Sequence, residues 1–84
     1  METIKKFSDF NLVAVLKCNG FKECSPPVLD GIHVYFHFLT TPELDKEILS
    51  YLSGETKINP IAFGHFLRDI RRVASEIKGV ARHE

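Results

Sequence analysis

The sequence predicts an α+β domain in the order helix, β-hairpin, helix, helix. Three observations predict it: a hydrophobic period of two near the middle of the chain, apolar steps of three and four residues near its end, and helix start and stop residues between these segments. All 84 residues are expected to form one domain, because so short a chain buries only one small core. We expect that core to lie within about residues 7–78, with 79–84 as a frayed tail.

The first helix is expected over residues 9–19. Ser8 is the expected N-cap, because its hydroxyl can accept from the free backbone N–H groups of the first turn. Gly20 should end the helix in the left-handed conformation. Residues 12–16 are apolar on nearly every side, which predicts that this helix is buried or shares an interface.

Residues 32–39 alternate as only a strand does. Ile32, Val34, Phe36 and Phe38 share one face and alternate with polar or half-polar residues. Asp30-Gly31 is a turn signal, so residues 22–29 should form the partner strand of a hairpin. Pro26 and Pro27 cannot donate to a ladder, and they push this partner to the sheet edge or interrupt it.

Two helices follow. Thr41-Pro42-Glu43 opens one that ends at Gly54, and Asn59-Pro60 opens the other, which should run to about Lys78. The inward stripe of the first of these two is expected to be Leu44, Ile48, Tyr51 and Leu52. The stripe of the second is Phe63, Phe66, Leu67, Ile70, Val73, Ala74 and Ile77.

Two strands alone are marginally stable. Either the helices therefore do most of the packing, or two chains complete the fold by pairing through an edge strand or a helix. A homodimer or a larger protein partner is the expectation that follows.

The formal net charge of zero conceals an uneven distribution. Residues 1–56 hold five Lys/Arg and eight Asp/Glu, a sum of −3, whereas residues 57–84 hold six and three, a sum of +3. Neutrality thus excludes a uniformly basic nucleic-acid binder but leaves room for a local basic patch.

The last helix carries that patch. Arg68, Arg71, Arg72 and Lys78 share its outer face, with His65 one turn before Arg68. These residues could contact phosphates, or they could form an ordinary solvated face with local ion pairs. We favour the solvated face and keep nucleic-acid binding as the alternative.

A second candidate surface lies on the hairpin. His33, Tyr35 and His37 project together from the side opposite the predicted core. They could form a stacking platform, a partner surface or a pH-sensitive contact. We favour a second packing surface, covered by a helix or by another copy of the chain.

Neither a metal, a cofactor nor catalysis is expected. Cys18, Cys24, His33 and His37 are suitable zinc ligands, but their spacing does not match a tetrahedral site. No nucleophile, base and polarising group converge in the sequence. The two cysteines are too few for a disulfide framework, which indicates free thiols and a cytoplasmic protein. The longest apolar run, residues 12–16, is too short to span a membrane.

The order of these features resembles a family of short bacterial and phage-associated domains of unknown function. The matching pattern covers about residues 10–77. It comprises Asn19-Gly20-Phe21 after an apolar helix, Val34-Tyr35-Phe36-His37-Phe38, Pro42-x-Leu44 leading to Tyr51 and Gly54, Ile58-Asn59-Pro60 with Phe63, and Leu67-Arg68-x-Ile70-Arg71. The resemblance implies a shared fold and brings no catalytic or binding residues. Pro26-Pro27 departs from the continuous hairpin of such domains.

Together these features favour a small non-enzymatic protein–protein interaction module of a bacterial or phage cytoplasm. The apolar run of residues 12–16 and Tyr35 between two histidines are the surplus apolar surface that favours it. The alternatives are nucleic-acid binding through the last helix and a phage-encoded inhibitor that docks on a host factor.

Overall fold

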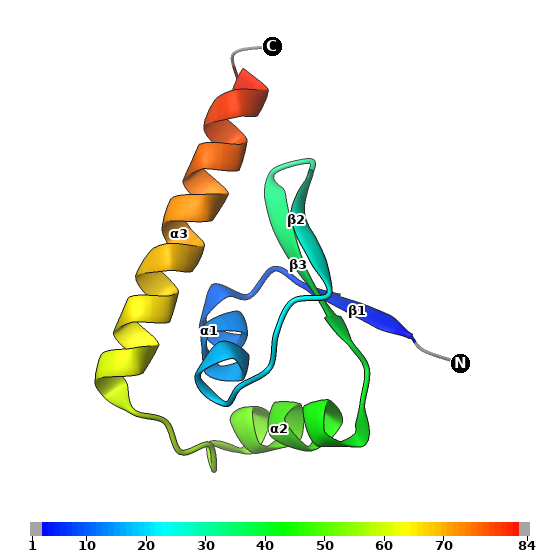
Figure 1. The fold of residues 1–84 in the computed structure, drawn as a ribbon, viewed down its shortest axis with the longest axis vertical. Helices are drawn as coiled ribbons and strands as arrows, with labels where there is room; N and C mark the ends of the chain where they lie inside the picture. Colours follow the sequence, from blue (N-terminus) through cyan, green and yellow to red (C-terminus); the bar gives the residue numbers. More distant parts are fainter. Residues whose placement is uncertain (1–2, 83–84) are drawn as a thin grey trace.

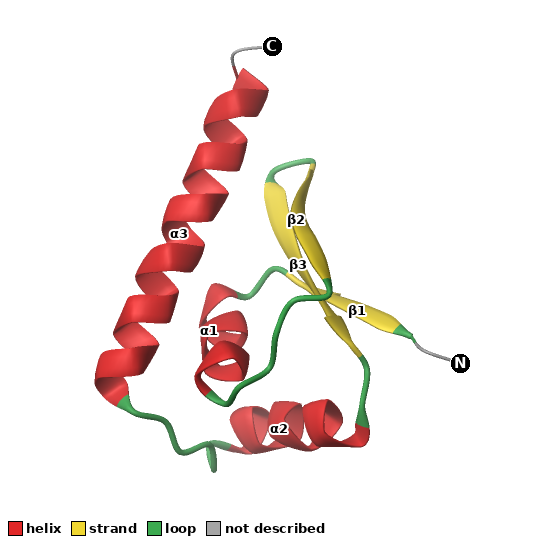
Figure 2. Ribbon diagram, viewed as in Figure 1, coloured by secondary structure: helices red, strands yellow, loops and turns green. Residues whose placement is uncertain are grey.

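The computed structural model describes residues 3–82, which form three strands and three helices (Figure 1). In chain order they are β1 (Ile4–Phe7), α1 (Phe10–Cys18), β2 (Ser25–Asp30), β3 (His33–Leu39), α2 (Pro42–Ser53) and α3 (Pro60–Arg82). The predicted α+β class with its hairpin and two following helices is confirmed. The helices lie to one side of the hairpin and below it (Figure 2).

The sheet has three strands, and the prediction of two was wrong. β3 lies in the centre, and β1 and β2 pair with it in antiparallel fashion. β1 places Ile4 opposite Leu39 and Phe7 opposite Phe36. Its four residues are too few for alternation to be visible in the sequence, so the strand is defined by its partner rather than by its own pattern. This third strand supplies the support that a lone hairpin lacks.

The β2–β3 hairpin turns one residue later in the chain than predicted. Asp30 pairs with His33 across a two-residue turn in which Gly31 has φ +65°. Ile32 therefore lies in the turn, where its side chain is 77% exposed, and its expected place in the core was wrong. β2 is an edge strand, as expected, and its register with β3 shifts between Ser25 and Val28, at the two prolines.

α1 is the central helix of the domain. Its N-cap is Asp9, not Ser8: the Asp9 carboxylate accepts from the amides of Asn11 at 3.0 Å and Leu12 at 3.3 Å. Gly20 ends the helix with φ +89°, as predicted. Residues 12–16 are all buried, packed among the other helices and the sheet. The apolar run is thus covered within the chain and needs no partner.

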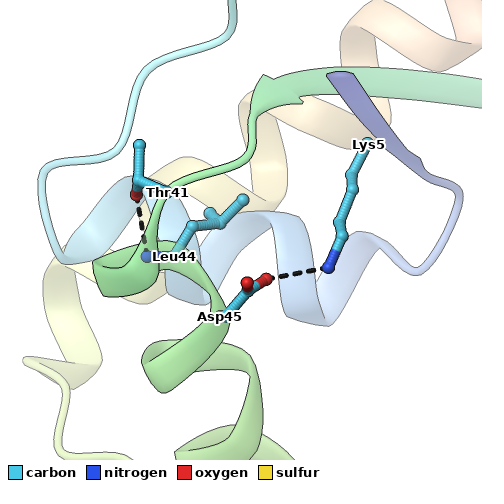
Figure 3. A network of polar contacts seen from close by, with 4 residues as sticks. All are labelled: Lys5, Thr41, Leu44 and Asp45. Carbon is cyan, nitrogen blue, oxygen red and sulfur yellow. Dashed lines mark hydrogen bonds and ion pairs between the residues drawn. The ribbon is translucent and has the colours of Figure 1, made fainter. Parts of the chain in front are cut away.

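α2 begins and ends where the sequence predicted. The Thr41 hydroxyl accepts from the Leu44 amide at 3.0 Å (Figure 3). Gly54 ends the helix with φ +77°. Leu44 is fully buried, but Leu52 is 71% exposed and its assignment to the inward stripe was wrong. At about 100° per residue, Leu52 lies roughly 80° around the helix from Leu44, outside the strip that α1 covers.

α3 is longer than expected and packs chiefly on α1. Asn59 caps it by accepting from the amides two and three residues on, at 2.9 and 3.1 Å. Ile70 and Ala74 are buried in the core. The helix continues through Gly79 to Arg82 instead of ending at Lys78, while residues 83–84 of the expected tail lie outside the described part of the chain.

The core joins the inner face of β3 to the helices. Its buried members are Leu12, Val13, Ala14, Leu16, Val34, Phe36, Phe38, Leu44, Ile70 and Ala74. A salt bridge of 2.8 Å between Lys5 of β1 and Asp45 of α2 adds a contact at the rim (Figure 3). One face of the sheet therefore packs in the core, and the opposite face is the one available for contact with another molecule.

Candidate interaction surface

The second face of the sheet brings together the three predicted surface residues and side chains from both neighbouring strands. Cross-strand pairing places Ile4 beside Leu39, Lys6 beside His37, and Val28 beside Tyr35, all on the side away from Phe36 and Phe38. We call the following set the open sheet face: Ile4, Lys6, Val28, His33, Tyr35, His37 and Leu39.

Within residues 3–82 this face has no helix over it. Ile4, Val28 and Leu39 are 55%, 53% and 39% exposed, whereas the alternate residues of β3 are buried against the helices. Of the two covers that the sequence left open, a helix or another copy of the chain, the helix of the same chain is thereby eliminated. A solvent-facing side of an antiparallel sheet normally carries polar side chains, so the three exposed aliphatic residues here are unusual.

Tyr35 is the centre of the open sheet face. The Lys6 ammonium lies 4.7 Å from the centroid of its ring, and the His33 ring lies 6.2 Å away in an edge-on arrangement. His37 is half-buried, and its Nδ1 is a buried atom without a hydrogen-bond partner among the described residues. These contacts hold the Tyr35 ring between Lys6 and His33, and the exposed Asp30 lies opposite His33 on the same face.

Both edges of the sheet are poor templates for an added strand. Pro26 and Pro27 remove two N–H donors from the β2 edge. β1 is only four residues long and carries Lys5 and Lys6. Short strands, lysines and prolines are the usual protection against edge-to-edge pairing, so the geometry favours contact through the face of the sheet rather than its edges.

The five residues predicted for the basic face of α3 divide into two groups. His65, Arg68 and Arg72 are exposed on the outer side, where Arg72 lies 3.5 Å from the Asp69 carboxylate. Arg71 and Lys78 instead line a groove against the start of α1. The predicted face thus exists, but its members do not converge on one point.

A metal centre has no support in the described residues, because no group of three or more His, Cys, Asp or Glu side chains there could hold an ion. Cys18 and Cys24 are free thiols, and burial raises the pKa of Cys18. Burial raises the pKa of Tyr51 too, assisted by the Asp9 charge and by a 3.4 Å hydrogen bond that the Tyr51 hydroxyl donates to Asp9. Neither group lies on the open sheet face.

Comparison with known families shows which family the chain belongs to. The family described as Domain of unknown function (DUF5659) matches residues 1–78. The chain belongs to this family. The expected membership in a family of domains of unknown function is thereby confirmed. No curated protein and no solved structure matches the chain.

The DUF5659 description assigns no function, so the function must be inferred from the geometry of this domain. Sequence reasoning found His33, Tyr35 and His37 but missed Ile4, Lys6, Val28 and Leu39. The first two lie on the unrecognised strand β1. Leu39 continues the alternation of His33, Tyr35 and His37, so the period of two could have assigned it to the outer face. Val28 lies on β2, where the two prolines and the register shift hide the alternation.

In the part of the DUF5659 domain that the structure describes, no helix is long and apolar enough to cross a membrane.

Proposed function

We propose that this DUF5659 domain is a small, non-enzymatic protein–protein interaction module that forms a homodimer through its open sheet face in a bacterial or phage cytoplasm. The observation that carries the proposal is the exposure of Ile4, Val28 and Leu39 around Tyr35. Aliphatic side chains that face water on a regular surface lose the stabilisation of burial, about 25 cal/mol per Å² of apolar area. A partner that covers them restores it.

A second copy is the occupant we favour. The chain has a formal net charge of zero, so two copies approach without long-range repulsion. A twofold arrangement lets one patch serve both partners, which is the commonest form of homo-oligomer. Because both sheet edges are blunted, the copies meet face to face. The two free thiols support a reducing compartment such as the cytoplasm.

The open sheet face is small for a protein–protein interface. Three strands at about 4.8 Å spacing and up to seven residues of about 3.4 Å each give a projected area of roughly 350 Å². A standard interface buries about 800 Å² per partner. We therefore expect a weak dimer, with a dissociation constant of roughly micromolar order.

Sedimentation velocity over about 1–500 µM protein tests the proposal. The wild type should shift from monomer to dimer across this range, and Val28→Lys should weaken association at least about tenfold by placing an unpaired charge in the interface. Leu49→Lys is the matched control, because Leu49 is an exposed aliphatic residue on α2, away from the sheet. A wild type that stays monomeric at 500 µM would refute the proposal. Equal weakening by both variants would refute the assignment of the face.

Nucleic-acid binding through α3 is the second candidate. It is supported by the exposure of Arg68, Arg71 and Arg72 on one helix. It requires affinity for generic DNA or RNA that falls steeply with salt, since neutralised phosphates release counterions. Absence of binding at about 50 mM salt eliminates it, whatever the oligomeric state.

A further inference from the structure

A groove of about 270 Å³ lies between α3 and the start of α1, separate from the open sheet face. Its lining is Phe10, Arg71, Ala74, Ser75 and Lys78. Arg71, Ser75 and Lys78 follow one another at steps of four and three residues, so their side chains share one strip of α3. The groove thus combines two cations and a hydroxyl with an apolar wall.

The two cations of this groove are unpaired within the described part of the chain. No acidic side chain lines the groove, and within residues 3–82 neither Arg71 nor Lys78 forms an ion pair. The nearby Asp9 carboxylate is engaged by the amides of Asn11 and Leu12 and by the Tyr51 hydroxyl. The N-terminal amides of α1 are capped by that carboxylate, so the positive potential of the groove comes from Arg71 and Lys78 themselves.

We propose that this groove binds the phosphate group of a small phosphate monoester. Arg71 and Lys78 would donate charge-assisted hydrogen bonds to the phosphate oxygens, and Ser75 would donate a third. Phe10 and Ala74 form the apolar wall against which the organic part of the ester packs. Phe10 is held in place by an edge-on contact with Phe36, with ring centroids 6.0 Å apart.

The shape of the groove favours a small ligand over a nucleic-acid strand. Its volume lies just below the range of about 300–1,000 Å³ typical of sites for drug-sized molecules. A backbone phosphate of a solvated strand gains nothing from an apolar wall, whereas the ester group of a monoester does. In addition, His65, Arg68 and Arg72 lie outside the groove, so the basic residues do not form one continuous track.

Titrating ¹⁵N-labelled protein with phenyl phosphate at constant ionic strength tests the proposal. We expect saturable NMR shifts at the amides of Phe10, Arg71, Ser75 and Lys78, with weaker binding of inorganic phosphate and none of phenol. Arg71→Ala should weaken phenyl phosphate binding at least about tenfold, because a charge-assisted contact is lost. Arg72→Ala removes the same charge from the same helix outside the groove, and it should change affinity less than about twofold.

Three results would each overturn the proposal. They are the absence of saturable shifts up to about 10 mM phenyl phosphate, equal weakening by Arg71→Ala and Arg72→Ala, and equal affinity for phenyl and inorganic phosphate. Tighter binding of a short DNA duplex that depends on Arg68 would overturn it in favour of nucleic acid. Both substituted arginines are exposed, so the variants should fold, and dispersion of the same NMR spectra verifies this.

Discussion

Replacing Asp9 by alanine should destabilise the domain by about 1–2 kcal/mol. The carboxylate accepts from two first-turn amides of α1, at 3.0 and 3.3 Å, and loss of an N-cap acceptor typically costs about 1 kcal/mol. The 3.4 Å hydrogen bond from the Tyr51 hydroxyl is long, so its loss adds only a few tenths of a kcal/mol. The total is a large part of the stability of roughly 4–13 kcal/mol usual for 84 residues.

Urea denaturation followed by circular dichroism measures this effect. With a denaturant slope of about 1 kcal/mol per M, the unfolding midpoint of Asp9→Ala should fall by roughly 1–2 M. Asp9→Asn should stay within about 0.5 kcal/mol of the wild type, because asparagine caps as well as aspartate. Ser8→Ala should be equally mild, since Ser8 is exposed and does not cap the helix. If Ser8→Ala proves as damaging as Asp9→Ala, the assignment of the cap is wrong.

Three further predictions concern the core, the ionisation of Tyr51 and the thiols. Phe36→Ala should cost about 3–5 kcal/mol in the free energy of unfolding because it leaves a cavity, whereas Ile32→Ala should stay within about 0.5 kcal/mol; comparable losses in urea melts would contradict the placement of Ile32 in the turn. Burial, and then the charge and hydrogen bond of Asp9, raises the pKa of Tyr51 in the folded state. The contribution of protonated Tyr51 to the free energy of unfolding is therefore complete below the unfolded pKa of 10.0, and it is lost as pH rises through the folded pKa. In urea melts between pH 8 and 12, the difference in free energy of unfolding between the wild type and Tyr51→Phe should decline only above about pH 9. A difference that stays constant with pH would refute the raised pKa of Tyr51. Iodoacetamide should modify exposed Cys24 before half-buried Cys18, whose pKa burial raises, and peptide mass spectrometry that finds equal rates would contradict the burial of Cys18.

The central strand of the open sheet face could be predicted from the sequence, but the neighbouring residues that complete the face could not. The period of two placed His33, Tyr35 and His37 together, because alternation along a strand is a local property. The aliphatic neighbours Ile4 and Leu39 come from opposite sides of α1 in the chain and meet only through pairing of β1 with β3. The sequence also identified the basic side of α3, yet it could not show that Arg71 and Lys78 face a groove closed by Phe10.

The sequence by itself determined the features that depend on neighbouring residues. Gly20 and Gly54 ended their helices as predicted, and Thr41 capped α2, because capping involves groups within one turn of the chain. The cap of α1 was one residue off, since Ser8 and Asp9 are both good capping residues and only the packing of α1 selects between them.

The tertiary structure alone decided what lies inside and what faces water. Residues 12–16 of α1 read equally well as an interface or a core, and enclosure by α2, α3 and the sheet made them core. β1 is defined by its hydrogen bonds to β3, because a segment of four residues with two lysines has little strand preference of its own. With α1 covered, the remaining exposed aliphatic residues of the sheet lie on the open sheet face, where burial depends on a contact that a single chain does not make.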